Sequence, residues 1–240
     1  MQRMFLFALV ALAIFVPVPS SMPISPKAPP SVLILSSVES QYPMQYLDGV
    51  TAELKQVGYN VTFVKDSAIT VSLITTQLDK YDIVIWRTDM YEVGNTTYWY
   101  LGQQANQTSL EAYAGAIALR TIDMSKGVFA ISADFLSSNF GPKSLANVKL
   151  AILMSSMSIT IAQIFIMAGV RATIDFFSPL NAPLSLFDWV TESLVDYLTS
   201  GSTVSDAVSK TLYNFDYGNS PDDNYLPPIS FLGDGNLIII

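Results

Sequence analysis

The candidates for chemistry in this chain are carboxylates and serines, and its 240 residues include no cysteine and no histidine. That composition excludes thiolate nucleophiles, zinc fingers, iron–sulfur clusters and Ser-His or Cys-His pairs. Asp89 follows the expected buried strand 82–86, and Ser156 follows the expected apolar strand 148–154, with Ser155 as the alternative if the register differs by one residue. Open α/β sheets bind ligands at the carboxyl ends of their strands, so Asp89 and Ser156 are candidates for a shared cleft. Ordinary polar residues at strand ends would explain both positions equally well.

The overall charge narrows the classes of partner. The chain carries a formal charge of −8, which disfavours nucleic acid and anionic membrane surfaces as partners. Half of the residues are hydrophobic and 13% are charged, so the chain has the composition of a folded domain rather than a disordered one. No sequence motif indicates a cofactor or a resident metal.

The first 30 residues have the pattern of an export signal followed by a linker. Arg3 precedes an unbroken apolar run, 4–16, which is typical of a signal-peptide core and shorter than the roughly 20 residues of a membrane-spanning helix. We therefore expect a signal peptide over 1–20, a proline-rich linker over 21–30 and a single domain over 31–240. An uncleaved anchor is the alternative, and it would be the chain's only contact with a membrane. Either alternative predicts a secreted or cell-surface protein.

Three N-x-[ST] sequons fit that location, since glycosylation requires exposed loops in an exported chain. They begin at Asn60, Asn95 and Asn106.

The body of the chain alternates buried-strand and helix patterns, which predicts a mostly parallel sheet with right-handed crossovers. The expected strands are 32–35, 61–63, 82–86, 148–154, 171–174 and a terminal strand within 231–240. The expected helices are 44–57, 71–78, 159–168, one opening at Ser185 and ending before Gly201, and one opening at Thr203. The segments 96–103 and 117–131 are rich in β-branched and aromatic residues and are expected to form a β insertion.

Several polar and aromatic groups have two interpretations each. Ser185 and Asp188 have the spacing of a capping box, and Asp188, Glu192 and Asp196 share one helix face, which predicts a solvated stripe. The aromatic run 98–100 could stack on a sugar or a partner chain, or pack its alternate rings on the core.

An acidic, amide-rich loop could supply oxygen ligands to calcium, although turn formation accounts for its composition equally well. Its members are Asp216, Asn219, Asp222, Asp223 and Asn224.

Four segments, in this order, resemble the caspase-like fold, the clan of caspases, gingipains, clostripains and CHAT-type domains. Segment 81–89 is similar to the family's third strand, which ends in the catalytic histidine. Segment 148–156 is similar to its fourth strand, which ends in the catalytic cysteine. The other matches are a helix, glycine and strand over 163–174, trailed by 201–207, and a closing Gly-Asp signature within 231–234. The resemblance covers 31–240 and implies a three-layer α/β fold with a mostly parallel central sheet.

The family's catalytic pair is replaced in this chain. Asp89 occupies the histidine position and Ser156 the cysteine position, and a carboxylate with a pKa near 4 is a poor base for an alcohol. Met90 takes the place often held in the family by a small residue after the histidine, whose backbone N–H can face the oxyanion. The resemblance thus implies a cleft at Asp89, Met90, Ser155, Ser156 and Asp175 that does not act as a cysteine peptidase.

The combined prediction is an exported prokaryotic pseudopeptidase domain that binds a peptide or protein ligand in the former active-site cleft, or that acts as a scaffold. Two other functions remain open. One is a serine-dependent hydrolase that uses Ser156 with Asp89 or another carboxylate. The other is a structural glycoprotein of the cell envelope.

Overall fold

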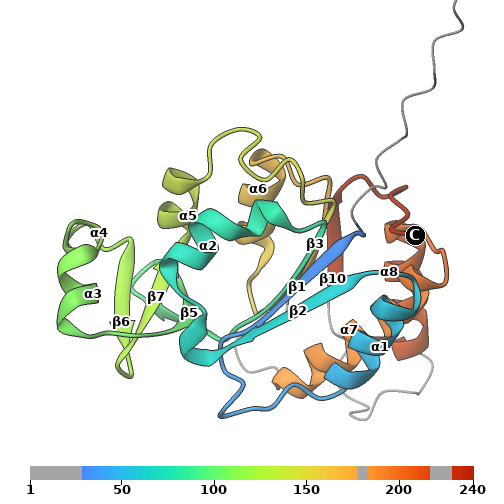
Figure 1. Cartoon of the computed structure of the whole chain (residues 1–240), viewed down its shortest axis with the longest axis horizontal. Coiled ribbons are helices and arrows are strands. Elements are labelled where there is room, and N and C mark those ends of the chain that lie inside the picture. Colours follow the sequence, from blue (N-terminus) through green and yellow to red (C-terminus); the bar gives the residue numbers. More distant parts are fainter. Residues whose placement is uncertain (1–28, 178–182, 217–228) are drawn as a thin grey trace, which may run out of the picture.

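The computed structural model describes residues 29–177, 183–216 and 229–240, and these form a three-layer α/β domain with a smaller second sheet at one end (Figure 1). The expected signal peptide, most of the linker and most of the acidic loop fall outside the described residues. Within the described ranges, every helix is too short or too polar to cross a membrane.

Sheet A is the central layer, and five of its strands are parallel, as expected. Its order is β10-β9-β8-β3-β1-β2, with β10 antiparallel to β9. Its strands are β1 Ser31–Ser36, β2 Asn60–Lys65, β3 Ile83–Arg87, β8 Leu150–Met154, β9 Ala172–Phe176 and β10 Ile229–Gly233. The inner strands β1, β3 and β8 consist mostly of buried apolar residues, as expected where helices cover both faces of the sheet, whereas the inner strand β9 also includes the buried polar residues Thr173 and Asp175.

The expected terminal strand is displaced in the structure. The last strand is β10, which ends at Gly233 with φ 87°, and the described residues 237–240 form no strand. Leu237 and Ile239 are nevertheless buried, so this end of the chain fills the core through its side chains rather than through strand pairing.

Helices form the two outer layers. One core cluster joins sheet residues such as Val32 and Ile34 to α1, α7 and α8, and a second joins Leu33 and Leu35 to α2, α5 and α6. The alternation along β1 therefore decides which side chain faces which helical layer. The helices in the three-layer part are α1 Leu47–Gln56, α2 Val71–Gln77, α5 Ala133–Asn139, α6 Ile159–Met167, α7 Leu184–Thr199 and α8 Val204–Asp216.

The expected β insertion is present as antiparallel sheet B, in the order β4-β5-β7-β6. Its elements are β4 Met90–Val93, β5 Thr96–Gln104, α3 Gln107–Ala112, α4 Ala114–Ala118, β6 Ile122–Ser125 and β7 Val128–Ser132. Along β5, Trp99 points into the core shared with sheet A, whereas Tyr98 and Tyr100 contact Tyr91 on the other face, Tyr98 stacked on its ring and Tyr100 tilted against it. The β5–β7 register shifts between Tyr100 and Gln104, so this end of β5 departs from regular pairing.

Two predictions about α7 are wrong. The helix begins at Leu184 after Pro183, so Ser185 lies inside its first turn and does not form a capping box with Asp188. Asp188 is fully buried rather than part of a solvated stripe, because it pairs with Arg87 across the end of sheet A.

Candidate functional site

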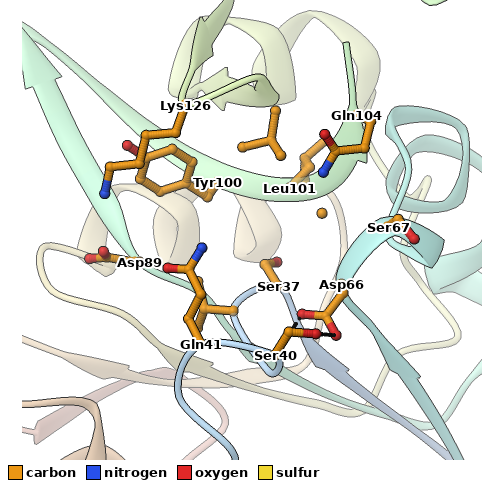
Figure 2. A pocket seen from close by; sticks show the side chains of 13 residues that line it. Ser37, Ser40, Gln41, Asp66, Ser67, Asp89, Tyr100, Leu101, Gln104 and Lys126 are labelled. Atoms are coloured by element: carbon orange, nitrogen blue, oxygen red, sulfur yellow. Dashed lines mark hydrogen bonds between the residues drawn. The ribbon is translucent and has the colours of Figure 1, made fainter. Parts of the chain in front are cut away.

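Two neighbouring pockets lie at the carboxyl edge of sheet A, where ligand sites of open α/β sheets are expected. Both are lined by the loop that follows β1 and by Asp89, which follows β3. The turn after β2 and strand β5 complete the first pocket, and the start of α7 completes the second. The Ser37 pocket, of about 330 Å³, includes Ser37, Gln41, Asp66, Asp89, Leu101 and Lys126 (Figure 2). The Arg87 pocket, of about 490 Å³, includes Tyr42, Pro43, Arg87, Asp89, Leu184 and Asp188. Gln41 and Asp89 line both pockets.

Ser37 is the most unusual polar residue at this edge. It follows the last residue of β1 and is only 8% exposed, yet its Oγ has no hydrogen-bond partner among the described residues. In Figure 2 its side chain lies at the floor of the pocket that bears its name. A buried hydroxyl without a partner costs free energy, so it is a position where a ligand atom could restore a hydrogen bond.

Asp89 lies beside the floor of the pocket and is partly exposed. Its Oδ1 accepts a hydrogen bond of 2.8 Å from the N–H of Met90. Its carbonyl oxygen accepts from the N–H of Tyr100 at 3.0 Å, which joins the end of β3 to β5. The backbone of Asp89 is thus fixed by sheet B, and the residue lines both pockets.

The roof of the Ser37 pocket is formed where the backbone of β5 at Gly102 lies close to the backbone of Asp66. A Cβ added to Gly102 would lie 1.5 Å from the carbonyl oxygen of Asp66, so β5 can cross the 3₁₀ turn η1, Asp66–Ala68, only because residue 102 is glycine. The N–H of Gln103 donates to the carbonyl of Ile69 at 3.0 Å and reinforces the contact. Asp66 itself has φ 47°, a left-handed conformation that aspartate tolerates better than most residues.

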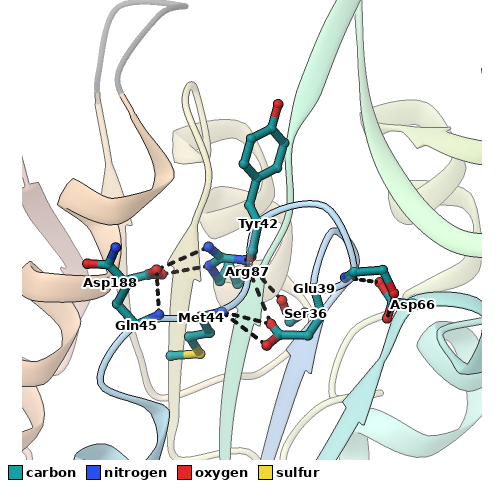
Figure 3. Close-up of polar contacts among 9 residues, drawn as sticks. Ser36, Glu39, Tyr42, Met44, Gln45, Asp66, Arg87 and Asp188 are labelled. Carbon is teal, nitrogen blue, oxygen red and sulfur yellow. Dashed lines mark hydrogen bonds and ion pairs between the residues drawn. The ribbon is translucent and has the colours of Figure 1, made fainter.

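Arg87 organises the floor of the second pocket (Figure 3). Its guanidinium is 1% exposed and binds Asp188 bidentately, with Nε–Oδ1 2.6 Å and Nη2–Oδ2 3.0 Å. Nη1 donates to Ser36 Oγ at 3.1 Å and to the carbonyl oxygen of Tyr42 at 2.8 Å. The Asp188 carboxylate also accepts from the N–H of Gln45 at 3.0 Å.

This arrangement ties the loop 37–46 to β3 and α7 at once. Burial raises the pKa of Asp188, and the hydrogen bonds from Arg87 and Gln45 oppose that rise. The loop carries residues of both pockets, so Arg87 and Asp188 position the site even where they do not touch a ligand.

The two candidate serines are placed differently from Asp89. Ser155 is 1% exposed and Ser156 is 7% exposed, and neither lines either pocket. Ser155 Oγ donates to the carbonyl of Ser156 at 3.2 Å. Nearby, Ser158 Oγ accepts from the N–H of Phe176 at 2.9 Å and fixes this turn to the end of β9. In the described part of the chain, no carboxylate is hydrogen-bonded to Ser155 or Ser156.

Asp89 and Ser156 do follow neighbouring strands. β3 and β8 are paired in parallel with Arg87 opposite Met154, so each candidate lies two residues beyond a paired position. Beyond these two positions the segments that follow β3 and β8 diverge. Asp89 leads into β4 of sheet B, whereas Ser156 leads into the turn before α6.

The other residues of the expected cleft are buried away from both pockets. Met90 begins β4, and its N–H is bound by the Asp89 carboxylate. Asp175 lies within β9 with no exposed surface, and Ser230 Oγ donates to its carboxylate at 3.0 Å. Burial raises the pKa of Asp175, and the hydrogen bond from Ser230 opposes this.

The sequence analysis did not single out Ser37, Arg87 or Asp188 as site residues. A signal for Arg87 was available, since an arginine at the end of a fully apolar strand requires a buried acidic partner. No comparable signal marks Ser37, because its lack of a hydrogen-bond partner is a property of the tertiary structure.

No protein-family model matches this sequence, and no curated protein matches it. Among solved structures, the chain is similar to protein GSU0716 from Geobacter sulfurreducens, with a TM-score of 0.43 and 11% sequence identity. The match covers 86% of this chain and 94% of that chain. A likeness of this size indicates nothing about function.

Proposed function

We propose that this chain is a non-catalytic ligand-binding module whose site is the pair of pockets at the carboxyl edge of sheet A. The observation that carries this proposal is the unpartnered, buried hydroxyl of Ser37 at the floor of a pocket that also presents the Asp89 carboxylate. A buried hydroxyl without a protein partner in a concave site is suited to bind a ligand. A peptide or a segment of a partner protein is the ligand that the resemblance to caspase-like domains implies.

A caspase-like ancestry is part of the proposal, and the parallel pairing of β3 with β8 supports it. If Asp89 and Ser156 replace a catalytic pair, restoring both ancestral residues should restore thiol chemistry. We expect the double variant Asp89→His/Ser156→Cys to react with peptidyl acyloxymethyl ketones faster than Ser156→Cys alone. Equal reactivity of the two variants would refute the caspase-like ancestry, whereas the proposal that the pockets bind a ligand would stand.

The competing function is a serine-dependent hydrolase that uses Ser156. Ser156 is buried, and the neighbouring Ser155 hydroxyl donates to the Ser156 carbonyl. In the described residues no carboxylate is bonded to either serine, so the groups that would activate a serine nucleophile are lacking there. We expect no labelling of Ser156 by a fluorophosphonate and no turnover of fluorogenic peptides with Arg, Lys or Asp at P1. Labelling or turnover that disappears in Ser156→Ala would overturn the non-catalytic proposal.

Secretion or cell-surface location is also proposed, on the N-terminal pattern and the sequons. Asn60, Asn95 and Asn106 are all exposed, but they differ in what their amides do. Asn106 Oδ1 accepts from the N–H of Ser109 as a helix cap, and Asn60 begins the edge strand β2. Asn95 lies in the exposed turn between β4 and β5 beside Gly94, so we expect it to be the most fully glycosylated. Mass spectrometry of chain recovered from its native source would show this, and a bare Asn95 with an occupied Asn106 would contradict it.

A further inference from the structure

The Ser37 pocket presents both hydrogen-bond donors and hydrogen-bond acceptors. Ser37 Oγ can donate and accept, and the side-chain amides of Gln41 and Gln104 can do the same. No hydrogen bond within the described residues uses either of those amides. Figure 2 shows Gln41 and Gln104 projecting toward the pocket from opposite walls. A ligand that uses these groups must itself donate and accept at several points.

The charges of the pocket disfavour an anionic ligand. Asp66 and Asp89 contribute two carboxylates and Lys126 one ammonium group, and the whole chain carries −8. The Asp66 carboxylate is already occupied, since Ser40 donates to it from its N–H at 2.9 Å and from its Oγ at 2.7 Å. Asp89 therefore provides the available carboxylate, and Lys126 lies over the Tyr100 ring at 5.7 Å from its centroid.

The pocket also has an apolar side and a limited size. Val38 and Val128 contribute apolar side chains to its lining, whereas the side chain of Leu101 is fully buried in the core. A volume of about 330 Å³ is at the lower end of the range for small-molecule sites, roughly 300–1,000 Å³. Such a space accommodates one ring with polar edges and an apolar face.

The strand that lines this pocket is poorly suited to an extended peptide. Peptides that bind in extended form usually pair with an exposed sheet edge. β5 is an inner strand of sheet B, between β4 and β7, and the edge strands of that sheet are β4 and β6. Side-chain contacts would have to carry the recognition of a peptide here.

We infer that the Ser37 pocket binds a neutral, hydroxyl-rich ring, that is, an uncharged sugar unit, and this inference rests on the proposed binding function. Ser37 Oγ and the two glutamine amides exchange hydrogen bonds with the sugar hydroxyls, and Asp89 accepts one from a hydroxyl group. The C–H face of the ring packs on the apolar side chains of Val38 and Val128.

The test uses the full domain with defined probes in saturation-transfer NMR and titration calorimetry. The probes are methyl glycosides of glucose, galactose, mannose and N-acetylglucosamine, the corresponding free sugars, glucuronate, and the methylamides of N-acetyl-lysine and N-acetyl-glutamine. We expect at least one neutral sugar to bind with a Kd on the order of 1 mM, as ligand efficiency predicts for so small a molecule. Glucuronate should bind more weakly than glucose because its carboxylate meets Asp89. Tighter binding of the methyl glycoside indicates the end of a glycan chain, and tighter binding of the free sugar indicates a diffusing sugar; both support the inference.

Substitutions of pocket residues test whether the sugar binds in the Ser37 pocket. Ser37→Ala and Asp89→Asn should each raise the Kd of the sugar about three- to tenfold, the loss of affinity expected for one hydrogen bond. Asp89→Asn keeps an oxygen for the Met90 N–H, so it should fold normally. The matched controls Ser72→Ala and Asp134→Asn change exposed residues outside the pocket and should leave the Kd unchanged.

Four outcomes would overturn the inference. If the methylamide of N-acetyl-lysine binds more tightly than every sugar and Asp89→Asn abolishes that binding, the ligand of the pocket is a cation. If the methylamide of N-acetyl-glutamine gives the same result, the ligand is a polar side chain of a peptide. In both cases the proposed binding function survives. If no probe binds, or if binding is indifferent to both pocket variants, the inference fails and the Ser37 pocket no longer supports the proposed function.

Discussion

Removing the charge of Asp188 should destabilise the whole domain, because this carboxylate neutralises a guanidinium that is 1% exposed. Asp188→Asn leaves Arg87 with Ser36 Oγ and the Tyr42 carbonyl, and with Glu39 as the remaining carboxylate at 3.9 Å. Breaking a buried pair by removing one partner costs about 3–5 kcal/mol. Since asparagine keeps one acceptor oxygen, we expect a loss of about 3 kcal/mol in the free energy of unfolding, or about 6–12 °C in Tm for a domain of this size.

Urea unfolding of wild type and variant measures this loss, and the chain offers an exposed pair for comparison. Arg171 and Asp234 are bonded at 2.7 Å but are 53% and 37% exposed, so Asp234→Asn should cost at most about 1 kcal/mol. The double variant Arg87→Met/Asp188→Leu removes both charges and should recover part of the loss. The reasoning is refuted if Asp188→Asn costs no more than Asp234→Asn, or if the double variant is less stable than Asp188→Asn.

Three further substitutions test the roof, the floor and the helical layer. Gly102→Ala should lower the free energy of unfolding by more than about 3 kcal/mol, because the new Cβ would overlap the carbonyl of Asp66. In the control Gly115→Ala the new Cβ meets open space in a helix, so this substitution should raise the free energy of unfolding by about 0.5–1 kcal/mol. Equal effects of the two substitutions in urea unfolding would contradict the close contact at Gly102. Ser37→Ala should raise the free energy of unfolding of the unliganded chain by about 1 kcal/mol, because it removes a buried hydroxyl without a partner, and a clear loss would show that the hydroxyl is bonded in solution. Burial and two neighbouring carboxylates on α7 raise the pKa of Glu53, so its contribution to stability is complete below the ordinary value of 4.5 and is lost as the pH rises through the raised value. Glu53→Gln should therefore lose less stability than wild type between pH 4.5 and about 7, as measured by urea unfolding at both values, and parallel profiles would contradict this.

The fold was largely predictable because its strands are buried on both faces. Runs such as 82–86 and 148–154 can be recognised as strands from hydrophobicity alone, and glycines such as Gly58 mark helix ends by their conformational freedom. The helix at 133–139 was missed, since it is short and follows directly on β7. The terminal strand was misplaced because apolar side chains at 237–240 fill the core without pairing, a distinction that composition does not make.

The site was predictable only in part. The rule that ligands bind at the carboxyl ends of strands located Asp89, which lines both pockets. It did not separate Asp89 from Ser156, whose environment depends on the turn before α6. Local spacing predicts that Asp188 belongs to a capping box, whereas its partner Arg87, 101 residues away, determines its role. Long-range pairing of this kind leaves no local pattern in a single sequence.

The central claim is that a ligand binds at the carboxyl edge of sheet A beside Ser37 and not at the buried serines. Amide chemical-shift mapping of the nitrogen-15-labelled chain, titrated with the sugar and amide probes described above, tests this most directly. The account predicts shifts concentrated on the loop 37–46, Asp66, Asp89 and Gly102, with Ser155 and Ser156 unaffected. Shifts centred on Ser155 and Ser156, with the loop 37–46 silent, would contradict it.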